Sequence, residues 1–119
     1  MKPLKIKNKC IKRKLSKCED VVRTYDKIQT AFADILETDK NIKSFECNVL
    51  TETFEDNQYT TDFLCIKTNG EYMVRECVYR KKLSLPRTCK LLDFSKNYWS
   101  NKGVTDWGIV IDKESNNEN

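Results

Sequence analysis

Residues 59–79 read YTTDFLCIKTNGEYMVRECVY and predict the central pair of strands. The two halves, residues 59–67 and 71–79, are rich in the β-branched and aromatic residues that favour strands. Between them lies Thr68-Asn69-Gly70, whose composition is typical of a tight turn. We therefore expect an antiparallel hairpin.

The turn length sets which residues of this hairpin face each other. A two-residue loop would place Asp62 opposite Cys77, whereas a three-residue loop with Gly70 in the left-handed conformation would place Asp62 opposite Glu76. In the second register two carboxylates share one face, close enough to bind one divalent metal ion. Alternatively, Glu76 simply pairs with a neighbouring basic residue such as Arg75.

A helix is predicted before the hairpin. Ser16 and Glu19 have the spacing of a capping box, so the helix is expected to begin there. Apolar residues then recur at steps of three and four up to about residue 37. They are Val21, Val22, Tyr25, Ile28, Phe32, Ile35 and Leu36. Alternation over residues 42–50 predicts a strand, and the polar residues 51–58 predict a loop.

After the hairpin, residues 87–102 have the apolar spacing of a second helix, and Gly103 stands at its expected C-cap. Trp107–Ile111 has the composition of a short buried strand. The order helix, strand, hairpin, helix, strand predicts a single small α/β domain, with a mixed β-sheet flanked by helices.

The length of 119 residues suits one domain. We assign residues 18–113 to it and expect residues 114–119 to be a disordered tail. Residues 1–17 are basic and contain no acid, so they form a predicted arm that could bind phosphates or serve only as a solubilising tail. Its candidate contact residues are Lys7, Lys9, Lys12, Arg13 and Lys14.

Several classes of protein are disfavoured by what the chain lacks. It has neither an apolar run of membrane-spanning length nor the apolar segment of a secretory signal, so an intracellular, cytoplasmic location is expected. The six cysteines form no CxxC pair, and we expect reduced thiols. Because there is no histidine, Ser-His-Asp and Cys-His catalysis are excluded. Carboxylates, lysines and metal ions remain as candidate catalysts.

Residues 59–64 (YTTDFL), 76–78 (ECV), 90–99 and 103–110 resemble, in order and spacing, the N-terminal domain of TnsA-type transposon endonucleases. The similarity extends from about Ile28 to Ile111. It implies the restriction-endonuclease-like fold of the PD-(D/E)xK superfamily and an origin in a mobile genetic element or phage.

The resemblance also implies a metal-dependent DNA-cutting site. It would consist of a glutamate on the first helix, an aspartate on the first hairpin strand and a lysine on the second. Asp62 matches the aspartate, but the helix position falls on Gln29, and the lysine position, two residues after Glu76, falls on Val78. An amide binds a hard cation far more weakly than a carboxylate does, and valine cannot orient a water molecule. The site is therefore expected to be degenerate.

Three functions follow as hypotheses. The favoured one is a nuclease-fold protein that binds DNA or a protein partner without cutting and without a cofactor. The second is an active Mg²⁺- or Mn²⁺-dependent DNA endonuclease subunit in transposition. In that case Asp62 and Glu76 bind the metal, and Arg80 or Lys81 replaces the missing lysine. Lys67 is a poorer substitute because it lies on the opposite face of its strand.

The third hypothesis is a phage or mobile-element inhibitor or adaptor that docks on a nucleic-acid-handling protein of the transposition or host-defence machinery. Here a second basic cluster would contribute to binding, with an affinity that falls as salt rises. Its members are Arg80, Lys81, Lys82, Arg87 and Lys90. By contrast, Phe94, Tyr98 and Trp99 have helical spacing and are expected in the core, as is Trp107 on its strand.

Overall fold

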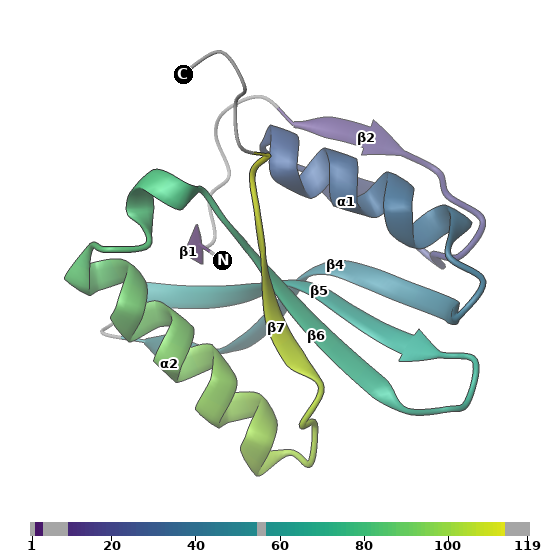
Figure 1. Cartoon of the computed structure of the whole chain (residues 1–119). Coiled ribbons are helices and arrows are strands. Elements are labelled where there is room, and N and C mark those ends of the chain that lie inside the picture. Colours follow the sequence, from purple (N-terminus) through teal and green to yellow (C-terminus); the bar gives the residue numbers. More distant parts are fainter. Residues whose placement is uncertain (1, 4–9, 55–56, 114–119) are drawn as a thin grey trace.

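The computed structural model describes residues 2–3, 10–54 and 57–113. In chain order the elements are β1 (Lys2–Pro3), β2 (Ile11–Arg13), β3 (Val22–Thr24), α1 (Lys27–Thr38), β4 (Ile42–Phe54), β5 (Asn57–Lys67), β6 (Tyr72–Val78), the short 3-10 helix η1 (Arg80–Lys82), α2 (Pro86–Asn101) and β7 (Trp107–Ile111). Figure 1 shows α1 and α2 on opposite sides of a twisted sheet. The predicted α/β domain with a mixed, helix-flanked sheet is thus confirmed. The predicted tail, residues 114–119, lies outside the described residues.

In the described part of the chain, β5 is the centre of a five-stranded sheet. It pairs antiparallel with β4 along one side and with β6 along the other. Where β6 has separated from β5, β1 pairs with Tyr59 and Thr60 instead. β7 pairs with β6 in parallel, which makes the sheet mixed. β2 and β3 form a separate antiparallel pair.

The β5–β6 hairpin has the three-residue turn. The Lys67 amide donates to the Glu71 carbonyl at 2.8 Å, and Gly70 lies between them with a φ of 91°. A φ in this region is unfavourable for residues with a Cβ atom, so glycine suits the position. Bonded pairs continue to Phe63 opposite Arg75. The same register places Asp62 opposite Glu76, as the three-residue loop predicts.

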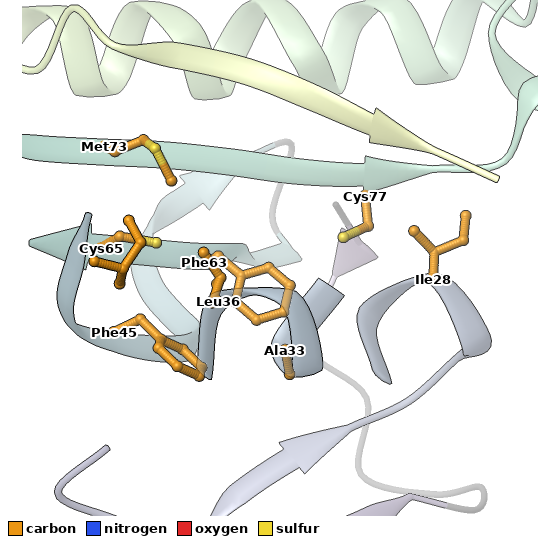
Figure 2. Packing of buried hydrophobic residues seen from close by; sticks show 9 residues of the cluster. Ile28, Ala33, Leu36, Phe45, Phe63, Cys65, Met73 and Cys77 are labelled. Atoms are coloured by element: carbon orange, nitrogen blue, oxygen red, sulfur yellow. The ribbon is translucent and has the colours of Figure 1, made fainter. Parts of the chain in front are cut away.

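The larger hydrophobic core lies between α1 and one face of the sheet. Figure 2 shows α1 side chains facing residues of β4, β5 and β6 in this core. The ring of Phe63 packs against that of Phe32 with centroids 5.3 Å apart. On the other face, Val74 packs with Trp99 and Val104 beneath α2. Because alternate residues of a strand point to opposite faces, β6 contributes to both cores.

The predicted helix start at Ser16 is wrong. The α1 helix begins at Lys27, where the Asp26 carboxylate caps it by accepting from the amide of Gln29. The Ser16 amide and hydroxyl instead bind the carboxylate of Glu37. Residues 22–24 alternate between buried and exposed and form β3, because β2 provides a partner strand for them.

The other local expectations differ in outcome. The loop predicted over residues 51–58 is wrong, because β4 continues to Phe54 and β5 begins at Asn57. The second helix is confirmed, since α2 ends at Asn101 with Gly103 at a φ of 89°. The last strand is confirmed in position as β7, Trp107–Ile111, but it is only half-buried and not buried as predicted, with Ile109 40% exposed. Among the described residues, no helix combines the length and apolar character that crossing a bilayer requires.

Candidate functional site

Asp62 and Glu76 face each other where β5 and β6 separate, and each carboxylate accepts from a backbone amide of the opposite strand. The Asp62 amide donates to Glu76 Oε1 at 2.9 Å, and the Cys77 amide donates to Asp62 Oδ2 at 2.7 Å. The side chains thus replace backbone ladder bonds beyond the last bonded pair of the two strands. Both residues are fully buried, with an exposed fraction of 0%. The structure therefore brings the predicted pair together, but inside the protein.

Gln29 reaches this pair from α1. Its Nε2 atom donates to Asp62 Oδ1 at 3.0 Å and to Asn48 Oδ1 at 2.8 Å. Its Oε1 atom accepts from the Tyr25 amide at 2.9 Å. A backbone amide can only donate, so this last bond fixes the orientation of the side chain. The face that Gln29 turns to Asp62 consequently carries N–H donors and no oxygen ligand.

Asn48 completes this side of the network and is a residue that sequence reasoning missed. It lies in β4 opposite Asp62 and has a φ of 56°. Asparagine tolerates this left-handed conformation better than most residues. Its Nδ2 atom donates to the Arg23 carbonyl at 2.6 Å, which directs its oxygen to Gln29. The available signal was an asparagine, a poor strand former, within a strand pattern.

Asn48→Ala is expected to lower the free energy of unfolding by about 1–3 kcal/mol. The variant loses two hydrogen bonds and forces a Cβ-bearing, non-polar residue into the left-handed region. Asn48→Gly is the matched control, because it loses the same bonds but adopts this φ readily. Urea denaturation of both variants provides the measurement. Equal losses in the two variants would show that the backbone conformation at residue 48 is not strained.

The Glu76 carboxylate also connects the sheet to α2. Its Oε2 atom accepts from Ser95 Oγ at 2.5 Å and from the Tyr59 hydroxyl at 3.2 Å. Trp107 Nε1 donates to the same Ser95 oxygen at 2.9 Å. Burial raises the pKa of Glu76 above its ordinary value, while its hydrogen bonds from Ser95 and Tyr59 act in the opposite direction.

The aromatic residues of α2 and β7 are mainly structural. Trp99 is buried and donates from Nε1 to Thr61 Oγ1 at 2.7 Å. Phe94, Tyr98 and Trp107 are half-buried, so the expected core role holds fully for Trp99 and only partly for these three. Phe94 stacks on Tyr98, and each of these rings also packs edge to face against a further aromatic ring. Rings engaged with one another in this way do not form an open platform for stacked bases.

Val78, at the position of the family's lysine, is buried, with an exposed fraction of 4%. The predicted substitutes for that lysine are Arg80, Lys81 and, less suitably, Lys67. Arg80 is exposed, and its amide and Nε atoms donate to Asp112 after β7. Lys81 is exposed on η1. Lys67 forms an ion pair at 2.6 Å with Asp106, in the loop before β7. These contacts hold Lys67 beside the start of β7 and Arg80 beside its end.

The residues of the predicted basic arm fall into three groups. Lys7 and Lys9 lie outside the described residues. Arg13, on β2, is half-buried and forms an ion pair with Asp34 of α1 at 2.5 Å. Lys12 and Lys14 are exposed. The described end of this segment, residues 10–17, thus packs on α1.

The donor set does not fit the divalent metal ion that the resemblance implies. Each of the four oxygens of Asp62 and Glu76 accepts a hydrogen bond from the protein, and Gln29 offers N–H groups where Mg²⁺ or Mn²⁺ would need oxygen. Within the described ranges, no three acidic, cysteine or histidine side chains are arranged to bind a metal. A surface groove of about 380 Å³ lies elsewhere, between β2 and the start of α1.

Comparison with known proteins adds no family assignment. No protein-family model matches this chain, and a search of curated proteins gives no significant match. A functional proposal therefore depends on the geometry of the described residues and on the resemblance stated above.

Proposed function

We propose that this chain binds nucleic acid without cutting it, and that it is a degenerate relative of TnsA-type endonucleases from a mobile element or phage. The element order and the mixed sheet agree with the fold that the resemblance implies. The non-cutting part of the proposal is supported by the buried carboxylate pair, whose oxygens are bound by the protein's own donors. Water and a metal ion would have to displace these bonds.

The observation that carries the proposal is an exposed basic surface on η1 and the first turns of α2. It consists of Arg80, Lys81, Lys82, Arg87 and Lys90, all exposed. No acid occurs between residues 79 and 92. The α2 helix has no acid in its first turn and no side-chain cap, so these cations add to the positive end of the helix dipole. This arrangement disfavours the free helix and favours a bound polyanion.

Reversing charge on this surface tests the proposal. The Lys81→Glu/Lys82→Glu variant is expected to bind fluorescein-labelled duplex DNA at least tenfold more weakly than the wild type, because like charges now face phosphate. Fluorescence anisotropy at several salt concentrations gives the affinity and its salt slope, which should decrease by about 1 for each phosphate that the variant no longer neutralises. Lys40→Glu/Lys43→Glu is the matched control, with the same charge change on exposed residues around the start of β4.

Equal weakening in both variants would mean that net charge alone, and not this surface, binds DNA. The competing functions have their own outcomes. Nicking of DNA with Mn²⁺ that Asp62→Ala abolishes would establish the active endonuclease. No DNA binding even at low salt, together with recovery of a nucleic-acid-handling protein from nuclease-treated lysate, would favour the adaptor.

A further inference from the structure

We infer that β7 is a pairing edge through which two copies of this chain associate. In the described part of the protein, the strand order ends at β7, which pairs with β6 on one side only. Its sequence, WGIVI, contains no charged residue and no proline. Ile109, at its centre, is 40% exposed. Natural edge strands usually carry charges, prolines or bulges that prevent such pairing.

The backbone of β7 presents the groups that a further strand needs. Val74 of β6 pairs with Trp107, and its amide donates to the Asp106 carbonyl at 2.8 Å. In a parallel ladder, this register directs residues 106, 108 and 110 to β6. The amides and carbonyls of residues 109 and 111 then point away from β6, to the outer edge of the sheet.

The opposite edge of the sheet provides a contrast within the same molecule. β4 contains Lys43, Glu46 and Glu52. The Phe45 amide donates to the Lys17 carbonyl at 3.1 Å, so the segment before α1 covers part of this edge. At Asn48 the left-handed backbone interrupts the strand geometry. Charged residues, a covering segment and an irregular backbone therefore protect β4 against pairing with a further strand, whereas β7 contains neither a charged residue nor a proline.

A second copy fits this edge because β7 is self-complementary in the antiparallel direction. A two-fold axis at Ile109 would pair this residue with its own equivalent and Trp107 with Ile111 of the second copy. Ile109 and Ile111 present both backbone groups outward, so the central hydrogen-bonded pair is also an apolar pair. The Trp107 amide already donates to the Thr105 carbonyl at 2.9 Å, so in its pair with Ile111 only the Trp107 carbonyl takes part. The register also places Asp106 opposite Asp112. In each copy Lys67 and Arg75 form ion pairs with Asp106, and the Asp112 carboxylate accepts from the Arg80 amide. Because both copies use the same surface, this contact is isologous, and assembly stops at two copies.

Ile109→Pro tests the dimer directly. Proline removes an amide that points away from β6, so the ladder within the chain is retained while pairing with another copy is blocked. We expect the wild type to sediment as a concentration-dependent dimer and the variant as a monomer with an unchanged far-UV spectrum. Ile109→Lys should give the same result by placing a charge on the edge. The matched control is Ile35→Lys on α1, which is 55% exposed and should remain dimeric.

A wild-type protein that sediments as a monomer at every concentration overturns the inference, and so does a dimer that neither Ile109 variant disrupts. A cross-linking experiment covers the case in which the variants fail to fold. With the exposed Cys89 replaced by serine, Ile109→Cys should form a reducible covalent dimer, since facing Cα atoms of a hydrogen-bonded pair lie about 5.5 Å apart. Leu50→Cys on β4, also exposed, should not. These readouts do not depend on DNA binding.

Discussion

Gln29→Glu is expected to lower the free energy of unfolding by about 3 kcal/mol or more at neutral pH. In the wild type, Asp62 Oδ1 accepts a hydrogen bond from Gln29 Nε2 at 3.0 Å. The change puts a second carboxylate oxygen in the place of this donor. Gln29 and Asp62 are both fully buried, so solvent cannot screen the repulsion. Asn48 Oδ1 would lose its donor from Gln29 as well.

Urea denaturation across pH provides the measurement, and Gln58→Glu, on an exposed position of β5, is the matched control with an expected change within about 0.5 kcal/mol. The pKa of the carboxyl group introduced at position 29 would be raised in the folded state, so its penalty applies above the ordinary glutamate pKa of about 4.3 and diminishes as pH falls. A Gln29→Glu protein as stable as the control would contradict the network.

The Gln29→Glu variant also tests whether the native amide prevents Mn²⁺ from binding. Gln29→Glu would place a second buried carboxyl group against that of Asp62, and two adjacent carboxylates offer the oxygen ligands that a hard cation prefers. If Mn²⁺ raises the Tm of the variant and leaves that of the wild type unchanged, the native amide is what prevents metal binding. A rise in the wild type would instead favour the metal-dependent endonuclease.

Glu76→Ala is expected to cost about 3–5 kcal/mol. The variant leaves the Asp62 amide and the hydroxyls of Ser95 and Tyr59 without the acceptor that they share, and it opens a cavity between β6 and α2. Chemical denaturation measures the loss, and Glu46→Ala on the exposed side of β4 is the control. A loss no larger than that of the control would show that the Glu76 network does not hold α2 to the sheet.

Comparing the stability of the wild type with that of Glu76→Gln isolates the effect of the charge at position 76. Burial raises the pKa of Glu76, so the ionised carboxylate is disfavoured in the folded protein above its ordinary pKa, and protonation relieves this penalty as pH falls. The stability of the wild type relative to Glu76→Gln should therefore increase between neutral and acid pH. Asp106 acts in the opposite sense because Lys67 lowers its pKa, but it is present in both proteins and cancels in the difference.

The amino-acid pattern alone was sufficient to predict those helices and strands that are specified by residues close together in the chain. The hairpin, α2 and β7 each have a period, a turn or a glycine within their own residues that favours one conformation. Gly70 and Gly103 both adopt the positive φ that their positions suggested. Such signals involve neighbours in the chain, so no distant contact is needed to interpret them.

Residues 16–25 were predicted wrongly because their apolar spacing suits a helix as well as a strand. The conformation was decided by β2, which pairs with β3 and satisfies its backbone bonds. The register of the hairpin was likewise open, since both turn lengths suit Asn69-Gly70.

The nature of the site depended still more on distant contacts. Asp62 and Glu76 could be expected to face each other, but not to be sealed from solvent. Gln29 lies 33 positions before Asp62, and Asn48, which accepts from the same Gln29 atom, has an unusual backbone angle. Only the packing of α1 on the sheet makes the Gln29 amide a donor to Asp62. Residue types by themselves establish which groups are available, whereas tertiary structure decides which of them are desolvated together, and desolvation determines how strongly they interact.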